Sequence, residues 1–313
     1  MMRIRVKDKE TMMFSAISSW ARFGRFASSV LMVLCGLAQT SFAQDTKPPS
    51  PATTQPTSRP AQDAPDPPAE GSIADESDVA AIALADLTMK AMGGRQAWDE
   101  TRYIAWDFFG SRRHIWDKHT GNVRIEYADS ESGEPIILLM NINTIKGRAW
   151  RNDDEVADAE ALKEMLKRGK GAWINDGYWL LMPYKLKDPG VTLKYLGEKM
   201  MEDGRSAEVV QLTFTDVGNT PQNKYHVYIA NDTQLVEQWD YFSNADDVEP
   251  RFKIPWRDWK RHGRIMLSGD RGERGGQALK HTGIAVFDEL PESVFTSPEP
   301  IDLSQFEQAP SDR

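Results

Sequence analysis

The feature that most constrains the fold of this chain is a long series of short segments with strand character. Turn pairs such as Thr120-Gly121, Asp203-Gly204 and Asn231-Asp232 separate several of them, which favours antiparallel hairpins over βαβ units. We expect a mainly β (α+β) fold built on a curved antiparallel sheet of about ten or eleven strands. The segments are Tyr103 to Phe109, Ser111 to Trp116, Val123 to Tyr127, Pro135 to Ile142, Lys146 to Trp150, Val191 to Gly197, Ala207 to Phe214, Lys224 to Ile229, Leu235 to Phe242, Gly263 to Ser268 and Lys280 to Phe287.

Two helices are expected beside these strands. The first runs from about Ser77 to Met92 and stops at Gly93-Gly94, and the second spans Asp158 to Arg168. An antiparallel sheet of about ten strands must curl to bury one face. Only the first helix and residues 158–186 are available to cover that face. We therefore expect an unclosed barrel with helices on its concave side.

An aromatic run from Gly171 to Val191, GAWINDGYWLLMPYKLKDPGV, follows the second helix directly. Asn175 and Asp176 could cap a new helical turn there, whereas Pro183 and Pro189 prevent a long helix. The sequence therefore predicts a short, stiff, apolar segment that is either a fixed plug or a lid over the sheet.

Aromatic side chains are more numerous than a simple sheet-on-helix core requires. The chain has 10 tryptophans, and all but one of them follow residue 90. Any single ring is explained by ordinary core packing, but flat rigid rings can also line a cavity without filling it. We predict a hollow between the sheet and the lid that binds an apolar ligand. Its predicted lining residues are Trp106, Phe108, Trp116, Trp173, Tyr178, Trp179, Leu180, Met182, Tyr184, Tyr225, Trp239 and Tyr241.

Four stretches of the chain carry a resemblance to known proteins. They are AMGGRQAWDE (Ala91 to Glu100), SRRHIWDKHTGNVRIE (Ser111 to Glu126), WINDGYWLLMPYKLKDPGV (Trp173 to Val191) and DVGNTPQNKYHVYI (Asp216 to Ile229). With these stretches, the region from Ala91 to about Pro298 resembles a family of uncharacterised secreted bacterial proteins. That family is itself similar to the periplasmic lipoprotein carriers LolA and LolB.

The resemblance to the carriers implies an unclosed antiparallel barrel with a helical lid, whose apolar hollow receives acyl chains. It also implies a strand arginine that contacts the lid, and Arg112 and Arg113 are the nearest candidates. The expected partners are a lipid or acyl chain and an envelope protein, and no cofactor is expected.

The N-terminal residues have the pattern of a secretory signal peptide. An apolar run from Ala27 to Ala38 follows Arg22 and Arg25 and precedes the small-residue end Ser41-Phe42-Ala43, which is the order found in such peptides. We expect cleavage near Ala43 and a periplasmic or secreted protein. The alternatives are a membrane anchor, for which the run is shorter than the roughly 20 apolar residues required, and a protein lipidated at Cys35.

Composition sets the remaining expected boundaries. Residues 1–43 are the expected signal peptide, 44–74 a disordered Pro-rich tether, 75–306 the folded domain and 307–313 a disordered tail. After cleavage, 32 basic residues would face 45 acidic ones, which argues against nucleic acid as a partner. The only cysteine, Cys35, lies in the signal peptide, so neither a disulfide nor a cysteine nucleophile is expected.

The best candidates for a metal or acid-base site are His114, Asp117 and His119. On a strand, His114 faces away from the other two, and we expect all three to be solvated beside a hairpin turn. The Gly-rich stretch Gly269 to Gly276 is expected to be a mobile hairpin loop. We therefore predict a non-enzymatic envelope protein without a metal site. The alternatives are a hydrolase or lyase that uses His114, Asp117 or His226, and a structural protein-docking module.

Overall fold

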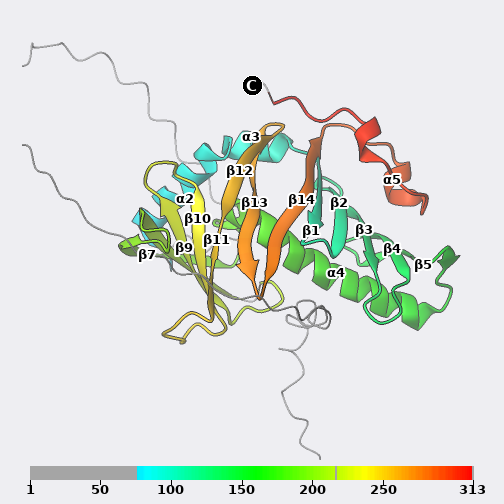
Figure 1. The fold of residues 1–313 in the computed structure, drawn as a ribbon, viewed down its shortest axis with the longest axis horizontal. Coiled ribbons are helices and arrows are strands. Elements are labelled where there is room, and N and C mark those ends of the chain that lie inside the picture. Colours follow the sequence, from blue (N-terminus) through cyan, green and yellow to red (C-terminus); the bar gives the residue numbers. More distant parts are fainter. Residues whose placement is uncertain (1–75, 216, 312–313) are drawn as a thin grey trace, which may run out of the picture. The chain divides into compact units, whose positions relative to one another are not determined.

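The computed structural model describes residues 76–215 and 217–311 (Figure 1), so the predicted signal peptide and tether lie outside the described residues. The helices are α2 (Val79–Ala91), α3 (Gly94–Glu100), α4 (Ala159–Leu181) and α5 (Ser293–Thr296), with 3-10 turns η2 (Met182–Lys185) and η3 (Leu303–Gln305). The strands are β1 (Tyr103–Phe108), β2 (Arg112–Asp117), β3 (Asn122–Ala128), β4 (Pro135–Asn141), β5 (Lys146–Arg151), β6 (Asp154–Glu155), β7 (Val191–Met200), β8 (Ser206–Phe214), β9 (Lys224–Ala230), β10 (Val236–Phe242), β11 (Phe252–Pro255), β12 (Arg257–His262), β13 (Ile265–Arg274) and β14 (Gln277–Phe287).

The fourteen strands of this described part form two antiparallel sheets. The larger has the order β12-β13-β14-β1-β2-β3-β4-β5-β6 and the smaller the order β11-β10-β9-β8-β7, so neither closes on itself. The prediction of a mainly β fold of unclosed antiparallel sheet with covering helices is confirmed. Each of the eleven predicted segments contains a strand.

The chain passes from one sheet to the other at Trp256. β11 ends at Pro255 and pairs with β10, whereas β12 begins at Arg257 and pairs with β13. Trp256 between them is fully buried, and its backbone N–H donates to the backbone carbonyl of Glu237 at 2.8 Å. The expected single sheet is therefore divided at this corner into two hydrogen-bonded sheets.

α4 is much longer than the predicted second helix. Its N-cap is Asp158, whose carboxylate accepts from the N–H of Ala161 at 2.8 Å. The helix continues through Asn175 and Asp176 to Leu181, so the expected break and the short separate segment are wrong. Asn and Asp cost an interior helical turn only about 0.7 kcal/mol each, which tertiary contacts can outweigh.

α4 lies against both sheets. In Figure 1 it runs behind the strands from the small sheet to β5. At Gly169 it approaches β4 so closely that an added Cβ would lie 2.5 Å from Leu138 Cδ1. We call the sheet faces that contact α4 the inner faces, and the opposite ones the outer faces.

The predicted first helix ends as expected but is followed at once by another. Gly93 has φ 116°, a left-handed conformation that glycine adopts without strain, and α3 starts at the next residue. At the other end of α2, the N–H of Asp78 donates to the carbonyl of Leu193 at 2.9 Å. Its carboxylate accepts from the N–H of Tyr195 at 2.8 Å. These bonds protect part of the edge strand β7.

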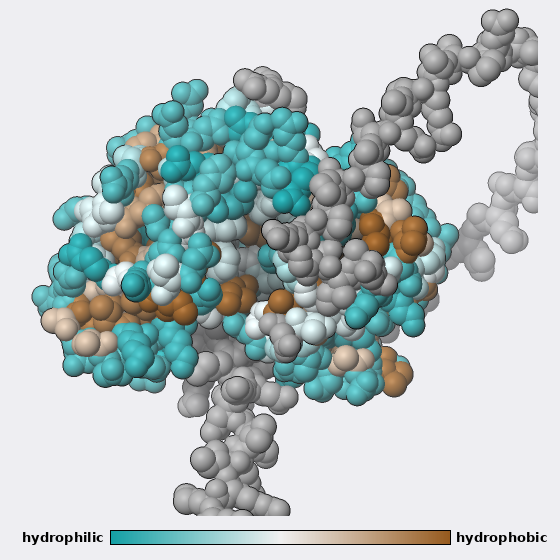
Figure 2. Space-filling model, turned by 180° about the vertical axis from the view of Figure 1, so that it is seen from behind, coloured by the Kyte–Doolittle hydropathy of each residue, from teal (hydrophilic) through white to brown (hydrophobic). Residues whose placement is uncertain are grey.

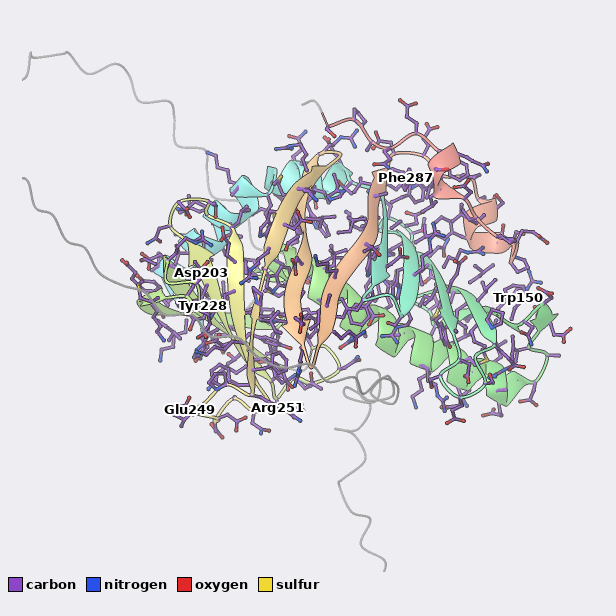
Figure 3. The ribbon with its side chains drawn as sticks, in the orientation of Figure 1. Trp150, Asp203, Tyr228, Glu249, Arg251 and Phe287 are labelled. Carbon is purple, nitrogen blue, oxygen red and sulfur yellow. The ribbon has the colours of Figure 1, made fainter. Side chains whose placement is uncertain are left out.

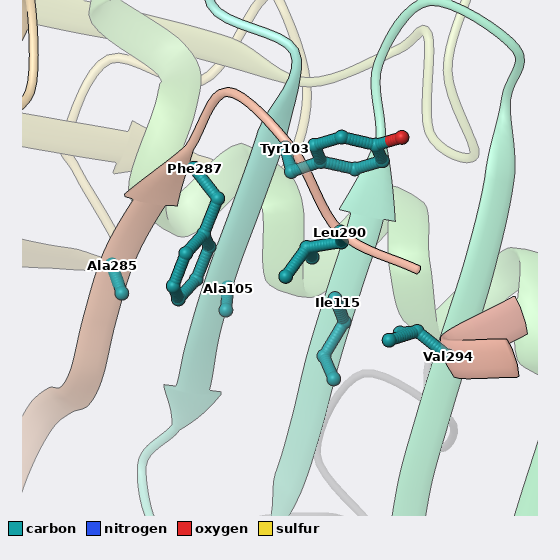
Figure 4. Close-up of a cluster of buried hydrophobic side chains, with 7 residues drawn as sticks. All are labelled: Tyr103, Ala105, Ile115, Ala285, Phe287, Leu290 and Val294. Carbon is teal, nitrogen blue, oxygen red and sulfur yellow. The ribbon is translucent and has the colours of Figure 1, made fainter. Parts of the chain in front are cut away.

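The C-terminal segment covers the outer face of the larger sheet. Leu290 and Val294 pack on an apolar cluster (Figure 4) whose other members are Tyr103, Ala105, Ile115, Ala285 and Phe287. Beside it, the fully buried Arg124 donates to the carbonyls of Ser297 at 2.7 Å and Glu299 at 2.9 Å. Contact with the sheet continues past residue 306, because the N–H of Ala309 donates to the carbonyl of Val286 at 2.8 Å.

Within residues 76–215 and 217–311, no helix is both long enough and apolar enough to cross a membrane.

Candidate functional site

The predicted lining residues surround α4. Ten of the twelve are buried, and Trp173 and Tyr178 are partly buried. The hydrophobic residues exposed on the face shown in Figure 2 form patches between larger hydrophilic areas. The twelve comprise Trp106 and Phe108 on β1, Trp116 on β2, Tyr225 on β9, Trp239 and Tyr241 on β10, Trp173, Tyr178, Trp179 and Leu180 in α4, and Met182 and Tyr184 in η2.

Ring contacts connect α4 to both sheets. Towards the larger sheet, the rings of Trp173 and Trp116 are 5.1 Å apart, centroid to centroid. Towards the smaller sheet, Trp179 meets Trp239 edge-on at 4.9 Å. Aromatic pairs in such geometries contribute roughly 0.5–1.5 kcal/mol beyond the area that they bury. These rings pack α4 onto the inner faces.

A buried polar cluster joins the C-terminal half of α4 to β2. The Asp176 carboxylate, fully buried, accepts from Arg112 Nε at 2.6 Å and from Arg112 Nη2 at 2.9 Å. The same carboxylate lies 2.8 Å from Nε2 of His114, which is also fully buried. Asn175 Nδ2 donates to it as well, at 2.9 Å. We call Arg112, His114 and Asp176 the Asp176 cluster.

The Asp176 carboxylate is held in its ionised form. Burial acts to raise its pKa, but the hydrogen bonds and charges of Arg112 and His114 outweigh burial and lower the pKa to about 2. Burial acts to lower the pKa of Arg112, but the hydrogen bond to Asp176 and the negative charge of that carboxylate together outweigh burial and raise the pKa. The lowered pKa of Asp176 and the raised pKa of Arg112 both reflect one tight ion pair between α4 and β2.

A second polar contact holds the C-terminal end of α4. The backbone carbonyl of Trp179 accepts from Arg271 Nε at 3.1 Å and from Arg271 Nη2 at 2.7 Å. His281 Nε2 lies 3.2 Å from the same oxygen. The Arg271 guanidinium also donates to Ser268 Oγ at 2.7 Å and lies 3.5 Å from the ring centre of Trp256. We call this arrangement the Trp179 carbonyl clamp.

His281 is a neutral hydrogen-bond donor in this clamp. Burial, and then the positive charge of Arg271, hold the pKa of His281 well below its usual range. Because Nε2 faces a carbonyl oxygen, the proton of the neutral ring is on Nε2. A positive group at the C-terminal end of a helix is also favoured by the helix dipole, and Arg271 meets that condition.

The structure separates the two candidate arginines. Arg112 faces α4 through Asp176, whereas Arg113 lies on the opposite side of β2, with Nη1 4.0 Å from the Glu126 carboxylate and 3.4 Å from the carbonyl of Ile301. Of these two candidates, only Arg112 contacts α4 in the described residues.

The expected solvation of the His114, Asp117 and His119 group is wrong for two of its members. His114 is buried beneath α4, and Asp117 is buried and bonded to Arg102 Nη2 at 3.1 Å. His119 is exposed, with Nε2 3.0 Å from the carbonyl of Asp99. His226, the third residue of the alternative enzymatic site, lies on β9 in the other sheet. Across residues 76–215 and 217–311, no three His, Cys, Asp or Glu side chains are grouped as a metal site.

The expected mobile loop at Gly269 to Gly276 is also wrong. Residues up to Arg274 belong to β13, and only Gly275 and Gly276 form the turn to β14. Arg271 in this stretch is fully buried and anchors α4. Its role was hidden in the sequence because its partner, Trp179, is 92 residues away.

A separate shallow hollow lies on the outer face. It measures roughly 310 Å³ and is bordered by α5 and three neighbouring strands. It shares none of the predicted lining residues. Its walls are formed by Asn122, Leu139, Met140, Asn141, Lys146, Gly147, Arg148, Phe295 and Thr296.

Comparisons with known proteins give distant structural similarity alone. No family model matches the chain, and no curated protein matches it. A DUF1329 family protein from Desulfovibrio piger has 12% sequence identity and a TM-score of 0.37, over 69% of this chain and 97% of that one. MucB has 12% identity and a TM-score of 0.22, over 75% and 64%. The MucA/MucB complex of Pseudomonas aeruginosa has 13% identity and a TM-score of 0.19, over 51% of each chain. Similarity this low supports no conclusion about function.

Proposed function

We propose that this protein is a non-enzymatic protein of the cell envelope that binds an apolar ligand, such as a lipid or the acyl chains of a lipoprotein, between α4 and the inner faces. In this proposal α4 is a lid, held closed by the Asp176 cluster. The observation that carries the proposal is that a largely buried ion pair attaches the aromatic face of α4 to the sheet: the Asp176 side chain is fully buried and the Arg112 side chain is 18% exposed.

A permanent plug has no need of such a pair. Buried ion pairs are often no more stabilising than apolar side chains of the same volume, because both charges lose their hydration. A buried pair does, however, make closure depend on a few directed bonds. Once those bonds break, the charged groups are better placed in water, and the helix has a reason to stay away from the sheet.

The aromatic surface beneath α4 is suited to alkyl chains. Burying apolar surface stabilises a complex by about 25 cal/mol per Å², or roughly 0.8 kcal/mol per methylene group. An acyl chain that replaced the α4 contacts of Trp116 and Trp239 would restore the apolar burial lost on opening. The predicted signal peptide, with its expected cleavage near Ala43, supports placing this binding in the cell envelope.

An enzymatic role finds less support. The three residues of that alternative are dispersed: His114 faces α4, Asp117 is bonded to Arg102, and His226 belongs to the smaller sheet. The arrangement therefore favours binding over hydrolysis.

Native mass spectrometry and titration with a fluorescent fatty acid test this proposal. We expect protein purified from its own envelope to carry a lipid. We also expect the Asp176→Asn variant to bind the probe at least about tenfold more tightly than the wild type, because opening the lid then requires less free energy.

Asp117→Asn is the matched control, since it changes another buried, arginine-bonded aspartate that does not touch α4. It should leave probe binding unchanged. The proposed function would be refuted if the wild-type protein carried no lipid and if neither it nor the two variants bound the apolar probe. A structural or protein-docking role would then remain.

A further inference from the structure

Unpartnered polar atoms are concentrated around α4. Among the described residues, nine buried side-chain nitrogen or oxygen atoms have no hydrogen-bond partner, and eight of them belong to residues on the inner faces, in α4 or at the Trp256 corner. Thr88 in α2 is the exception. Most buried polar groups in proteins are paired, so a group of unpaired ones in one place calls for an explanation.

Five of these atoms are indole N–H groups, which can only donate. Their rings lie in or beside α4: Trp173 of α4 meets Trp116 at 5.1 Å, and Trp239 meets Trp179 of α4 at 4.9 Å. Trp106 stacks on His114 at 4.6 Å, and Trp256 lies 5.4 Å from Trp239. By contrast, the indole of Trp259 donates to the carbonyl of Val236 at 2.9 Å. The five unpartnered indoles are those of Trp106, Trp116, Trp173, Trp239 and Trp256.

The excess of donors decides which chemistry would satisfy this surface. The Tyr178 hydroxyl is also unpartnered and can donate. Against these six donors, the only other unpartnered atoms there are Nδ1 of His114 and Nδ1 of His281. A ligand that only filled apolar space would leave the donors unpaired. A ligand with several oxygen acceptors would pair them.

We propose that the ligand of the inner faces is an acyl ester, whose carbonyl oxygens accept from the indole N–H groups when α4 has moved aside. Ester oxygens accept and do not donate, which matches the excess of donors. They are also uncharged, so they enter an aromatic surface at lower desolvation cost than a carboxylate. This inference rests on the proposed function and adds the polar chemistry of the ligand to it.

The test compares two ligands of equal length, methyl dodecanoate and an n-alkane, as competitors of a bound fluorescent probe. For each ligand, the free energy of transfer from water into liquid alkane is subtracted from the binding free energy. The difference reports the ligand's specific contacts with the protein. We expect the wild-type protein to favour the ester on this scale. Trp106→Phe and Trp239→Phe keep an aromatic ring but remove one donor. Because methyl dodecanoate has one ester group and the two indoles lie on different sheets, at least one of the variants should reduce the preference about fivefold, and an unchanged preference in both would overturn the inference.

Trp150→Phe is the control for lost ring volume. Trp150 lies on β5, beneath the guanidinium of Arg148 at 4.5 Å and away from the smaller sheet that holds Tyr228 (Figure 3). This variant should leave the ester preference unchanged. Equal binding of ester and alkane by the wild type would overturn the inference while leaving the proposed function standing. Displacement of the probe by neither ligand would refute both.

Discussion

Replacing Asp176 by asparagine should remove one pH-dependent contribution to the free energy of unfolding of this protein. In the folded protein the pKa of Asp176 is lowered from 3.8 to about 2. A lowered pKa means that the ionised form stabilises the fold. The contribution is complete above the unfolded pKa of 3.8 and is lost as the pH falls through about 2.

The size of this contribution follows from the pKa. Lowering it from 3.8 to about 2 corresponds to about 2.5 kcal/mol at neutral pH. The variant should lose more than this, about 3–5 kcal/mol, because Arg112 is left largely buried without a carboxylate. Near pH 2, where the Asp176 carboxyl of the folded protein is half protonated, the difference between the two proteins should have shrunk by about 2 kcal/mol.

Urea unfolding of both proteins between pH 7 and pH 2 measures this difference directly. Titration of all other groups affects both proteins almost equally, so it cancels when the two curves are subtracted. A difference that stays constant over the whole range would refute the reasoning, because it would mean that Asp176 is not ionised in the folded protein or that its bonds contribute nothing.

Three further predictions concern the C-terminal segment, α4 and the N-terminus. Arg124→Leu should lower the free energy of unfolding by about 2–3 kcal/mol and speed proteolysis after Pro291, because the bonds of Arg124 to the carbonyls of residues 294–299 are lost. As a control, Arg148→Leu replaces an exposed arginine and should change the free energy of unfolding in urea by less than about 1 kcal/mol. Gly169→Val should cost about 1–3 kcal/mol in thermal or urea unfolding, since its Cβ would lie 2.5 Å from Leu138 Cδ1. Gly171→Ala, whose Cβ meets nothing within 4 Å, should be neutral or stabilising, and equal effects of the two would contradict the close approach of α4. N-terminal sequencing of exported protein should begin at Gln44; a mature chain that retained residues 27–43, or a lipidated Cys35, would contradict the expected cleavage.

The strands could be predicted because their signals are local. Alternation and turn residues lie within each hairpin, and all eleven predicted segments contain strands. The three that were missed have weak local signals. β6 has two residues, β11 has four and ends in Pro255, and β12 reads RDWKRH without apolar alternation on an exposed edge. The pairing that holds such strands comes from their neighbours.

The candidate site was predicted only in part, because its polar contacts join distant positions. The aromatic residues and Arg112 were identified from composition and resemblance. Asp176 was interpreted as a helix cap, since its partners Arg112 and His114 are 64 and 62 residues away. The alternation of β2 correctly turned His114 away from Asp117, but nothing local indicated that a helix would cover it.

Trp179 connects these observations, because its side chain and its backbone engage different sheets. Its ring packs against Trp239 of the smaller sheet, while its carbonyl accepts from Arg271 of the larger one. The Asp176 cluster lies one helical turn earlier and also bonds to the larger sheet. In the proposed lid, moving the N-terminal part of α4 away from the sheet would break the cluster first, and the clamp would still hold the helix end at β13. We therefore propose the C-terminal end of α4 as the pivot of this lid. Because that end lies beside Trp256 at the corner, opening would not require the two sheets to separate.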